Sequence, residues 1–257
     1  MRNSSGDSVV TRAFGLLSAY TPERSEMTLE ELVEECGLAR STAHRLAVQL
    51  ADLGALERTP RGWRLGLRLF ELGQIVPRPQ HLRDIALAHM EDLYEATRET
   101  VHLAVLEGDE VLYVEILSGH RKVPSPSRRG GRMPVHCTAV GKALLAFSGD
   151  GGRRAASAEA LVRLTSQTIT DPDRLLGELD DVRRTGLAYD REEARPGLIC
   201  VAAPILAGNG IAHAALSVSM PADGPLTITQ AAPALRTAAR ALTRALAVTR
   251  GDTRPSP

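Results

Sequence analysis

The stretch that decides the fold of the first part of the chain is Arg40-Ser-Thr-Ala-His-Arg-Leu-Ala-Val-Gln-Leu50. Its apolar positions recur at i, i+3, i+4 and i+7, which is the pattern of a helix that buries one face. These positions are Ala43, Leu46, Ala47 and Leu50. The remaining residues are polar or basic, so the pattern predicts a helix with a hydrophilic outer surface.

A shorter helix is predicted directly before this one. Thr28 and Glu31 have the spacing of a capping box, in which each side chain accepts a hydrogen bond from the other residue's backbone amide. The apolar stripe of this helix ends at Cys36, and Gly37 occupies the position of a left-handed C-terminal cap. Two helices joined by a short turn indicate a helix-turn-helix, whose second helix reads base edges while the first crosses the DNA backbone.

The residues that follow predict a β-hairpin. Leu56 to Leu65 has the composition of two short strands around a tip at Pro60 to Gly62, with Trp63 in the core. A hairpin beside the reading helix is a wing, suited to contact phosphates or the minor groove. The candidate DNA contacts are Thr28, Arg40, Ser41, Thr42, His44, Arg45, Gln49, Arg58, Arg61 and Arg64. Each of them taken singly could also be an ordinary solvated surface residue.

The distribution of charge supports the same assignment. The chain of 257 residues has 31 basic and 31 acidic side chains, and this balance argues against non-specific coating of nucleic acid or of an anionic membrane. Between Glu23 and Glu35 there are six glutamates and one arginine, whereas Arg40 to Arg68 contains six arginines and two acidic residues. Any DNA contact must therefore use the second stretch.

The chain is long enough for two domains. We predict a first helix capped by Ser8, with Val10, Phe14 and Leu17 on its apolar face. Pro77-Arg-Pro79 predicts a rigid, extended boundary. The predicted divisions are a winged domain over 1–66, a linker helix and proline-rich boundary over 67–80, a second domain over 81–250 and a disordered tail over 251–257.

The second domain is predicted to mix helices with antiparallel hairpins, which is typical of an α+β sensor-like fold. Asp171-Pro172 is a strong helix start signal, and Gly186 is the matching stop signal. No regular element is predicted over 118–132. The other expected elements are helices at 80–97, 138–147 and from about 231, and strands at 101–106, 111–117, 198–206 and 211–219.

From about Ser8 to Val248 the chain resembles the IclR family of bacterial transcriptional regulators. The resemblance implies a winged helix-turn-helix domain joined by a linker helix to a GAF-like α/β effector-binding domain. It also implies homodimers or homotetramers and DNA binding modulated by a small metabolite. Leu206 and Ala207 depart from the family, which usually has an aromatic residue and Asp or Asn there. The motifs that carry the resemblance are Ser41-Thr-Ala-His-Arg-Leu46, Leu65-Gly66, Met133-Pro-Val-His-Cys-Thr-Ala-Val-Gly-Lys-Ala-Leu-Leu-Ala146, Thr168-Ile-Thr-Asp171, Gly186-Leu-Ala-Tyr-Asp-Arg-Glu-Glu193, Pro196-Gly197 and Cys200-Val-Ala-Ala-Pro-Ile205.

The resemblance further implies which residues face an effector. The polar and backbone positions are Ala139, Val140, Asp190, Cys200, Ser217 and Ser219, and the apolar lining is Met133 and Leu198. The amides of a first helical turn have no intrahelical partner, so a helix that begins after Thr138 offers two N–H groups to an oxyanion. Two serines spaced two apart on a strand point to one face.

Asp190 restricts the chemistry of the expected ligand. An ionised carboxylate accepts hydrogen bonds and repels a second carboxylate at close range. The acid group of a ligand should therefore sit at the helix start and the serines, with a hydroxyl or hydrate turned toward Asp190. We expect a small hydroxy- or oxo-acid effector and a regulator that binds an inverted-repeat, double-stranded DNA operator, with RNA polymerase as a possible further partner.

Two other functions are open at this point. One is a small-molecule enzyme that uses Cys200 with His136 or His213 and carries a nucleic-acid-binding module, although no orienting acid is evident. The other is a constitutive DNA-binding protein whose second domain only forms oligomers. We predict no catalytic residue and no enzyme activity.

No cofactor or metal is predicted, because the spacing of His102, His120, His213 and Asp190 matches no metal motif. The three cysteines are far apart and form no CxxC pair, so reduced thiols are expected. No apolar run reaches the ~20 residues of a membrane-spanning helix, and no signal peptide is evident at Met1. We expect a cytoplasmic location.

Overall fold

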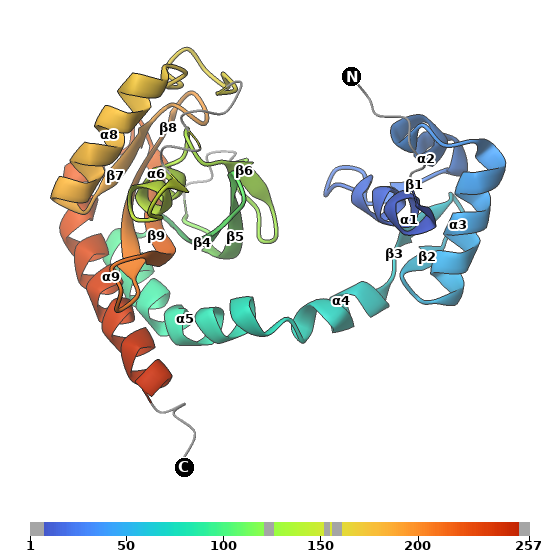
Figure 1. The fold of residues 1–257 in the computed structure, drawn as a ribbon, viewed down its shortest axis with the longest axis horizontal. Coiled ribbons are helices and arrows are strands. Elements are labelled where there is room, and N and C mark those ends of the chain that lie inside the picture. The colour runs from blue at the N-terminus through green and yellow to red at the C-terminus, as the bar shows by residue number, and fades with distance from the viewer. Residues whose placement is uncertain (1–7, 121–125, 152–154, 156–160, 252–257) are drawn as a thin grey trace. The chain divides into compact units, whose positions relative to one another are not determined.

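The computed structural model describes residues 8–120, 126–151, 155 and 161–251. The chain divides into two compact units, Met1–Gln80 and His81–Pro257 (Figure 1). The predicted tail at 251–257 lies outside the described residues except for Gly251, which belongs to the last helix. None of the described helices has both the length and the apolar character needed to span a membrane.

The first unit has the predicted winged helix-turn-helix. Its helices and strands are α1 (Val9–Ser18), β1 (Glu26–Met27), α2 (Leu29–Cys36), α3 (Arg40–Asp52), β2 (Leu56–Arg58), β3 (Trp63–Leu65) and α4 (Leu67–Gln74). The wing strands β2 and β3 pair antiparallel, and β1 adds a third strand beside β3. The sequence did not predict β1, because a strand of two residues is too short to show an alternation of apolar and polar side chains.

Local sequence signals set the start and the end of α2. Thr28 Oγ1 accepts a hydrogen bond from the Glu31 amide at 3.2 Å, and the Thr28 amide donates to Glu31 Oε2 at 2.7 Å. This confirms the capping box. Gly37 ends α2 with φ of 63°, a left-handed conformation that glycine adopts without a steric penalty.

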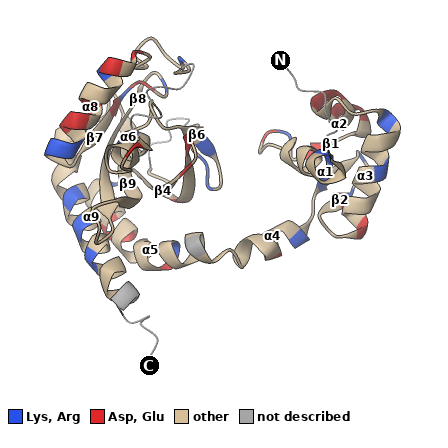
Figure 2. Cartoon of the chain, in the orientation of Figure 1, with Lys and Arg blue, Asp and Glu red and all other residues tan. Residues whose placement is uncertain are grey.

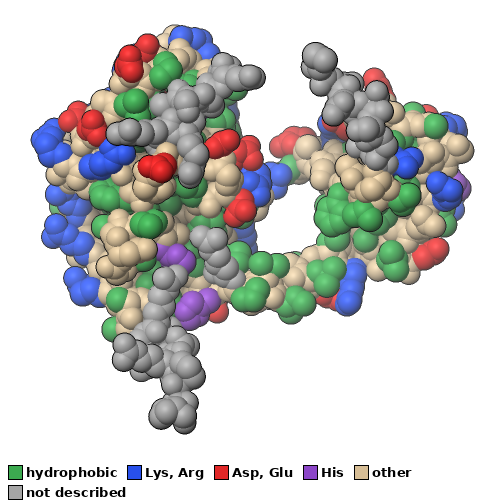
Figure 3. Space-filling model, viewed as in Figure 1, with side chains coloured by type: hydrophobic (Ala, Val, Ile, Leu, Met, Phe, Trp, Pro, Cys, Tyr) green, Lys and Arg blue, Asp and Glu red, His purple; other side chains and the backbone are tan. Residues whose placement is uncertain are grey.

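The predicted inner face of α3 is confirmed, since Ala43, Leu46, Ala47 and Leu50 are all buried. The residues predicted for the apolar face of α1 do lie together, but much of that face is exposed. Leu16 is the buried residue of that helix, whereas Val10 and Phe14 are 65% and 66% exposed. Figure 3 shows apolar side chains gathered on the surface of this unit.

The second unit is a three-layer structure around one antiparallel sheet. The sheet order is β6-β5-β4-β9-β8-β7, and the helices α5 and α9 pack on one face while α6 and α8 pack on the other (Figure 1). The strands are β4 (Thr100–Glu107), β5 (Glu110–Leu117), β6 (Arg132–Pro134), β7 (Ala188–Arg191), β8 (Leu198–Leu206) and β9 (Ala212–Pro221). The helices are α5 (Pro77–Thr97), α6 (Ala139–Ala146), α8 (Pro172–Thr185) and α9 (Ile228–Gly251).

The proline-rich boundary differs from the prediction. Pro77 and Pro79 lie in the first turn of α5 instead of an extended segment. Proline is tolerated there because the first amides of a helix have no intrahelical acceptor, and its fixed φ suits a helix start. The predicted range 118–132 also contains structure, since Arg132 begins β6 and the Gly130 amide donates to Tyr113 O at 2.8 Å.

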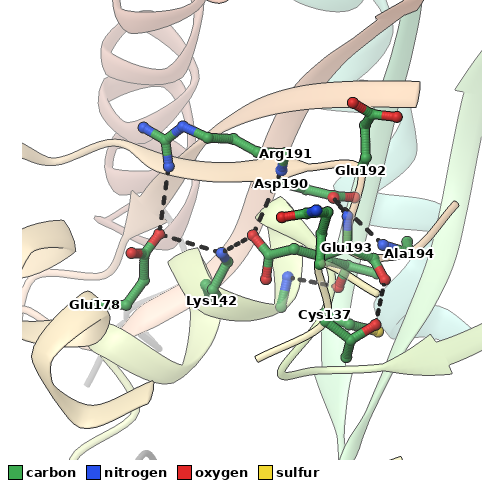
Figure 4. Close-up of polar contacts among 12 residues, drawn as sticks. Cys137, Lys142, Glu178, Asp190, Arg191, Glu192, Glu193 and Ala194 are labelled. Atoms are coloured by element: carbon green, nitrogen blue, oxygen red, sulfur yellow. Dashed lines mark hydrogen bonds and ion pairs between the residues drawn. The ribbon is translucent and has the colours of Figure 1, made fainter. Parts of the chain in front are cut away.

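A buried ion pair joins α6 to the turn after β7. Lys142 has no exposed surface, and its Nζ lies 2.7 Å from Glu193 Oε1 and 3.2 Å from Glu178 Oε1 on α8 (Figure 4). Arg191 Nη1 approaches Glu178 Oε1 at 3.9 Å. The two cations and two anions cancel, so the cluster has no spare positive charge.

The turn after β7 is held at several other points. Thr165 Oγ1 donates to Glu192 O, and Thr168 Oγ1 donates to Glu193 O, each at 2.7 Å. Asp190 Oδ1 accepts hydrogen bonds from the amides of Glu193 and Ala194. The ion pair and these hydrogen bonds therefore fix α6 against residues 190–194.

The first testable prediction concerns Lys142. Lys142→Met leaves Glu193 buried without its cation, and removing one partner of a buried pair costs about 3–5 kcal/mol. Urea unfolding followed by far-UV circular dichroism should show that loss. The double variant Lys142→Met, Glu193→Gln should be more stable than Lys142→Met alone, because no uncompensated carboxylate remains at residue 193. Equal stability of the single variant and the natural protein would contradict this account of the pair.

The second prediction concerns Gly62 at the wing tip. A Cβ added there would lie 2.1 Å from Met27 O, so alanine forces β1 away from the hairpin. Gly62→Ala should destabilise the first unit by about 1–3 kcal/mol. Trp63 is the single tryptophan, so its fluorescence during urea unfolding reports this unit. Gly15→Ala is the matched control, because its Cβ meets open space and alanine favours the helix by up to about 1 kcal/mol.

Candidate functional site

The outer face of α3 presents the side chains predicted to contact DNA. Ser41, His44, Arg45 and Gln49 are exposed, and Thr42 is half-buried. Thr28 caps α2 with its hydroxyl as acceptor, which leaves its own O–H proton free to donate. This face of α3 is exposed to solvent along its length, as it must be in a helix that enters the major groove.

The predicted arginines fall into two groups by their ion pairs. Arg40 pairs with Glu30, and Arg64 Nη2 lies 2.6 Å from Glu57 Oε2. In contrast, Arg45 makes no ion pair with any described residue, and the same holds for Arg61. Figure 2 shows acidic residues on α2 and basic residues on α3. The unpaired arginines keep their full charge for a phosphate or a base.

Arg58 is held differently. Its guanidinium lies 5.5 Å from the centroid of the Trp63 ring. The ring is buried, so this contact fixes the arginine stem on the wing while the side chain stays exposed. The ten predicted DNA-contact residues thus lie on α3, at the N-cap of α2 and on the wing.

The eight predicted effector residues of the second unit line one cavity. Its polar wall comes from the start of α6 and from β7, β8 and β9, and its apolar wall includes Met133 and Leu198. The cavity volume is about 20 Å³, close to the ~10–15 Å³ that one water molecule occupies by the same measure. The residues that line it from the predicted set are Met133, Ala139, Val140, Asp190, Leu198, Cys200, Ser217 and Ser219.

The start of α6 provides backbone donors at this cavity. Thr138 caps the helix, and its Oγ1 accepts the Gly141 amide at 3.2 Å. The amides of Ala139 and Val140 precede that bond and have no intrahelical acceptor. Gly141 is required here, because a Cβ would lie 2.1 Å from Val135 O. The close approach of the Val135 carbonyl brings the helix start against the sheet.

Asp190 lies on β7, and it is 1% exposed. Burial raises the pKa of Asp190 to about 7, and the nearby Glu193 adds to the rise, although the backbone amides and Lys142 act in the opposite direction. Asp190 is paired in register with Cys200 on β8. Sequence reasoning treated this carboxyl as ionised, whereas burial favours its protonated form near neutral pH.

Other polar residues line the cavity that the sequence did not reveal. His102 Nδ1 lies 3.3 Å from Ser217 Oγ, and its Nε2 lies 2.8 Å from Ser127 Oγ. Burial lowers the pKa of His102 to about 4, so the imidazole is neutral at pH 7. Tyr113 packs against it with 5.3 Å between ring centroids. His102 lies on β4 and Tyr113 on the neighbouring β5, and the pairing of β4 with β9 that brings this hairpin to the cavity is encoded by no local pattern.

The cysteines of this region are protonated thiols. Cys200 Sγ donates to Ser219 Oγ at 3.2 Å, and burial raises the pKa of Cys200 well above its ordinary value. Burial likewise raises the pKa of Cys137 to about 12. His136 Nε2 bonds Val162 O instead of a thiol. Within the described ranges, no cluster of three or more His, Cys, Asp or Glu side chains is arranged to hold a metal ion.

Comparison with known proteins matches both units. Residues 9–60 match the IclR helix-turn-helix domain, and residues 76–245 match the C-terminal domain of bacterial IclR transcriptional regulators. The HTH-type transcriptional regulator KdgR of Escherichia coli (strain K12) is 35% identical over 217 residues, covering 83% of this chain and 82% of KdgR.

Solved structures agree with this match. An IclR homologue from Microbacterium hydrocarbonoxydans, crystallised with 4-hydroxybenzoate, is 33% identical with a TM-score of 0.85 over 93% of this chain and 99% of that one. The Thermotoga maritima IclR structure is 31% identical with a TM-score of 0.76 over 93% and 98%. With both units matched in order and in fold, the chain belongs to the IclR family of bacterial transcriptional regulators.

Proposed function

We propose that this protein binds an inverted-repeat operator and changes its affinity for that operator when a small hydroxy- or oxo-acid occupies the cavity of the second unit. The observation that carries the proposal is the convergence of the α6 amides, Asp190, Ser217 and Ser219 on one cavity. Backbone donors at a helix start bind an acid group without a cationic side chain. The serine hydroxyls supply further donors on the opposite wall.

The size of the cavity favours a short ligand. An apolar cavity of ~150 Å³ accepts benzene, whereas this one measures about 20 Å³. An acid of two to four carbons therefore requires a smaller displacement of the cavity walls than a longer or an aromatic acid. The Microbacterium homologue was crystallised with an aromatic hydroxy-acid, and a ligand of that size would need a much wider cavity here.

The first unit supports recognition of paired half-sites. Val9, Val10 and Phe14 are 53%, 65% and 66% exposed, and an exposed apolar patch typically marks a protein interface. A homodimer formed through such a surface would carry two reading helices, and a homotetramer would carry four. RNA polymerase is a candidate partner of the DNA-bound assembly.

The enzyme alternative is less favoured by the chemistry of Cys200. A nucleophilic cysteine needs a thiolate, but the half-buried thiol of Cys200 hydrogen-bonds the side chains of Ser219 and Asp190, and burial and the nearby Asp190 raise its pKa well above the ordinary value. We therefore infer a sensor that leaves its ligand unchanged. Turnover of a bound acid that Cys200→Ala abolishes would establish the enzyme instead. The family match and the absence of a spanning helix among the described residues are consistent with a cytoplasmic location.

The third prediction tests the reading helix. Arg45→Ala should weaken specific operator binding by about 1–3 kcal/mol, roughly 5- to 150-fold in Kd, if the guanidinium contacts a base. Fluorescence anisotropy on a DNA fragment selected from a random library gives the Kd. Arg68→Ala is the matched control, because Arg68 lies on α4 and pairs with Glu71.

The selected fragments should contain half-sites whose centres lie about 10 bp apart or a multiple of that distance. Unchanged affinity in both Arg45→Ala and Ser41→Ala would refute the assignment of α3 as the reading helix.

The fourth prediction tests the sensor. Calorimetry with hydroxy- and oxo-acids of two to six carbons should detect binding by at least one, and the bound acid should change operator affinity by about 1–3 kcal/mol. Ser217→Ala should weaken that binding, since it removes a donor from the cavity wall. Binding of aromatic acids alone would reject the ligand class, and binding of an acid without any effect on the operator would indicate a constitutive DNA-binding protein.

A further inference from the structure

The electrostatics of the cavity raise a problem for any anionic ligand, and this inference rests on the proposed function. No lysine or arginine is among the described residues that line the cavity. The nearest buried cation, Lys142, already contacts the carboxylates of Glu193 and Glu178 (Figure 4). An organic acid that enters therefore gains no counter-ion from the described lining of the cavity.

The carboxylate of Asp190 adds a repulsion between like charges. Its side chain lines the same cavity, and a cavity of about 20 Å³ leaves a ligand no room to avoid it. Two carboxylates at a separation of ~4–6 Å disfavour the ionised state of one of them. Protonation of Asp190 removes the repulsion and turns an acceptor into an O–H donor.

The surroundings of Asp190 are compatible with a bound proton. The titratable groups that face it are Glu193 on the following turn, Lys142 and Cys137 at α6, Tyr113 on β5 and Cys200 on β8. The two thiols and the phenol are neutral at pH 7, and the charges of Lys142 and Glu193 offset each other at 2.7 Å. Oδ1 of Asp190 accepts hydrogen bonds from two backbone amides, and the carboxyl also hydrogen-bonds the Cys200 thiol, so a proton on Asp190 is expected on the oxygen that the amides leave free.

We propose that the cavity takes up an organic acid as its anion together with one proton, and that Asp190 carries this proton and donates it in a hydrogen bond to the ligand. No bond other than this O–H is formed or broken, and the proton comes from solvent. Asp190 is thereby a specificity-determining residue: it selects a ligand oxygen that accepts a hydrogen bond, such as a carboxylate, a carbonyl or a hydroxyl.

The alternative carrier of the proton is His102, which lines the same cavity. Burial holds the pKa of His102 at about 4, whereas burial holds the pKa of Asp190 at about 7. The imidazole is therefore neutral at pH 7, whereas burial already favours the protonated form of Asp190. Both ring nitrogens of His102 also lie within hydrogen-bond distance of serine hydroxyls, Ser217 Oγ and Ser127 Oγ, and this geometry favours Asp190 as well.

The sign of the pH dependence follows from this assignment. Since the bound anion raises the pKa of Asp190 further, binding is strongest below pH 7 and weakens as the pH rises above it. Since the pKa of Asp190 lies near 7 in the free protein, the Kd for an acid should rise by about an order of magnitude between pH 7.0 and pH 8.5. The acid itself is fully ionised over this range and contributes nothing to the change.

The fifth prediction is tested by calorimetry with pyruvate, glycolate and lactate at pH 8.0 in phosphate and in Tris, whose heats of ionisation differ. The natural protein should take up about 0.9 protons per bound acid, because about nine-tenths of Asp190 is ionised in the free protein at that pH. Asp190→Asn has the shape of the protonated residue, so it should bind with no proton uptake and no change in Kd from pH 7.0 to 8.5.

Two further variants separate the outcomes. His102→Gln should retain the proton uptake, and Asp180→Asn on the exposed surface of α8 should behave as the natural protein. Binding without proton uptake, or uptake that His102→Gln abolishes and Asp190→Asn retains, overturns this inference alone. Absence of binding by all three acids at every pH from 6.0 to 8.5 rejects the short-acid ligand class of the proposed function and this inference with it.

Discussion

The second unit depends on one buried ion pair. Lys142 has no exposed surface, and it joins α6 to Glu178 on α8 and Glu193 in the turn after β7, which are 36 and 51 residues further along the chain. The pair places the free amides at the start of α6 opposite Asp190. A buried ion pair adds little net stability compared with apolar packing, but it tolerates few other arrangements. We regard it as the constraint that sets the shape of the cavity.

The same constraint determines the chemistry of the cavity. Since Glu193 and Glu178 use the charge of Lys142, the described lining of the cavity offers an acid backbone amides and neutral hydroxyl groups but no cation. This arrangement suits a sensor better than a catalyst. A ligand held without a strong counter-ion binds with modest affinity and dissociates readily, as a response to changing metabolite levels requires. The thiol of Cys200, buried and protonated, adds a neutral contact instead of a nucleophile.

Much of the fold could be predicted from the sequence, because its signals are local. The capping box at Thr28, the glycine cap at Gly37 and the start signal at Asp171-Pro172 are each set by a few adjacent residues, and all three appear in the structure. An error arose where tertiary context decides. Pro77 and Pro79 were predicted to form an extended boundary, but they begin a helix.

The candidate cavity was predicted only in part. Its eight predicted residues came from motif positions, and the structure places them together. His102 and Tyr113 were missed, because the β4–β5 hairpin that carries them reaches the cavity through the pairing of β4 with β9, across more than 100 residues of chain. The ionisation of Asp190 was also misjudged, since burial and the proximity of Glu193 are properties of the folded state.

The central claim is that acid binding and operator binding are coupled, and coupling must be reciprocal. The most direct measurement is the Kd of the acid for the free protein and for the protein saturated with operator. The account predicts that operator DNA changes the Kd of the acid by the same factor, about 5- to 150-fold, by which the acid changes the Kd of the operator. An acid Kd that is identical with and without operator would contradict it.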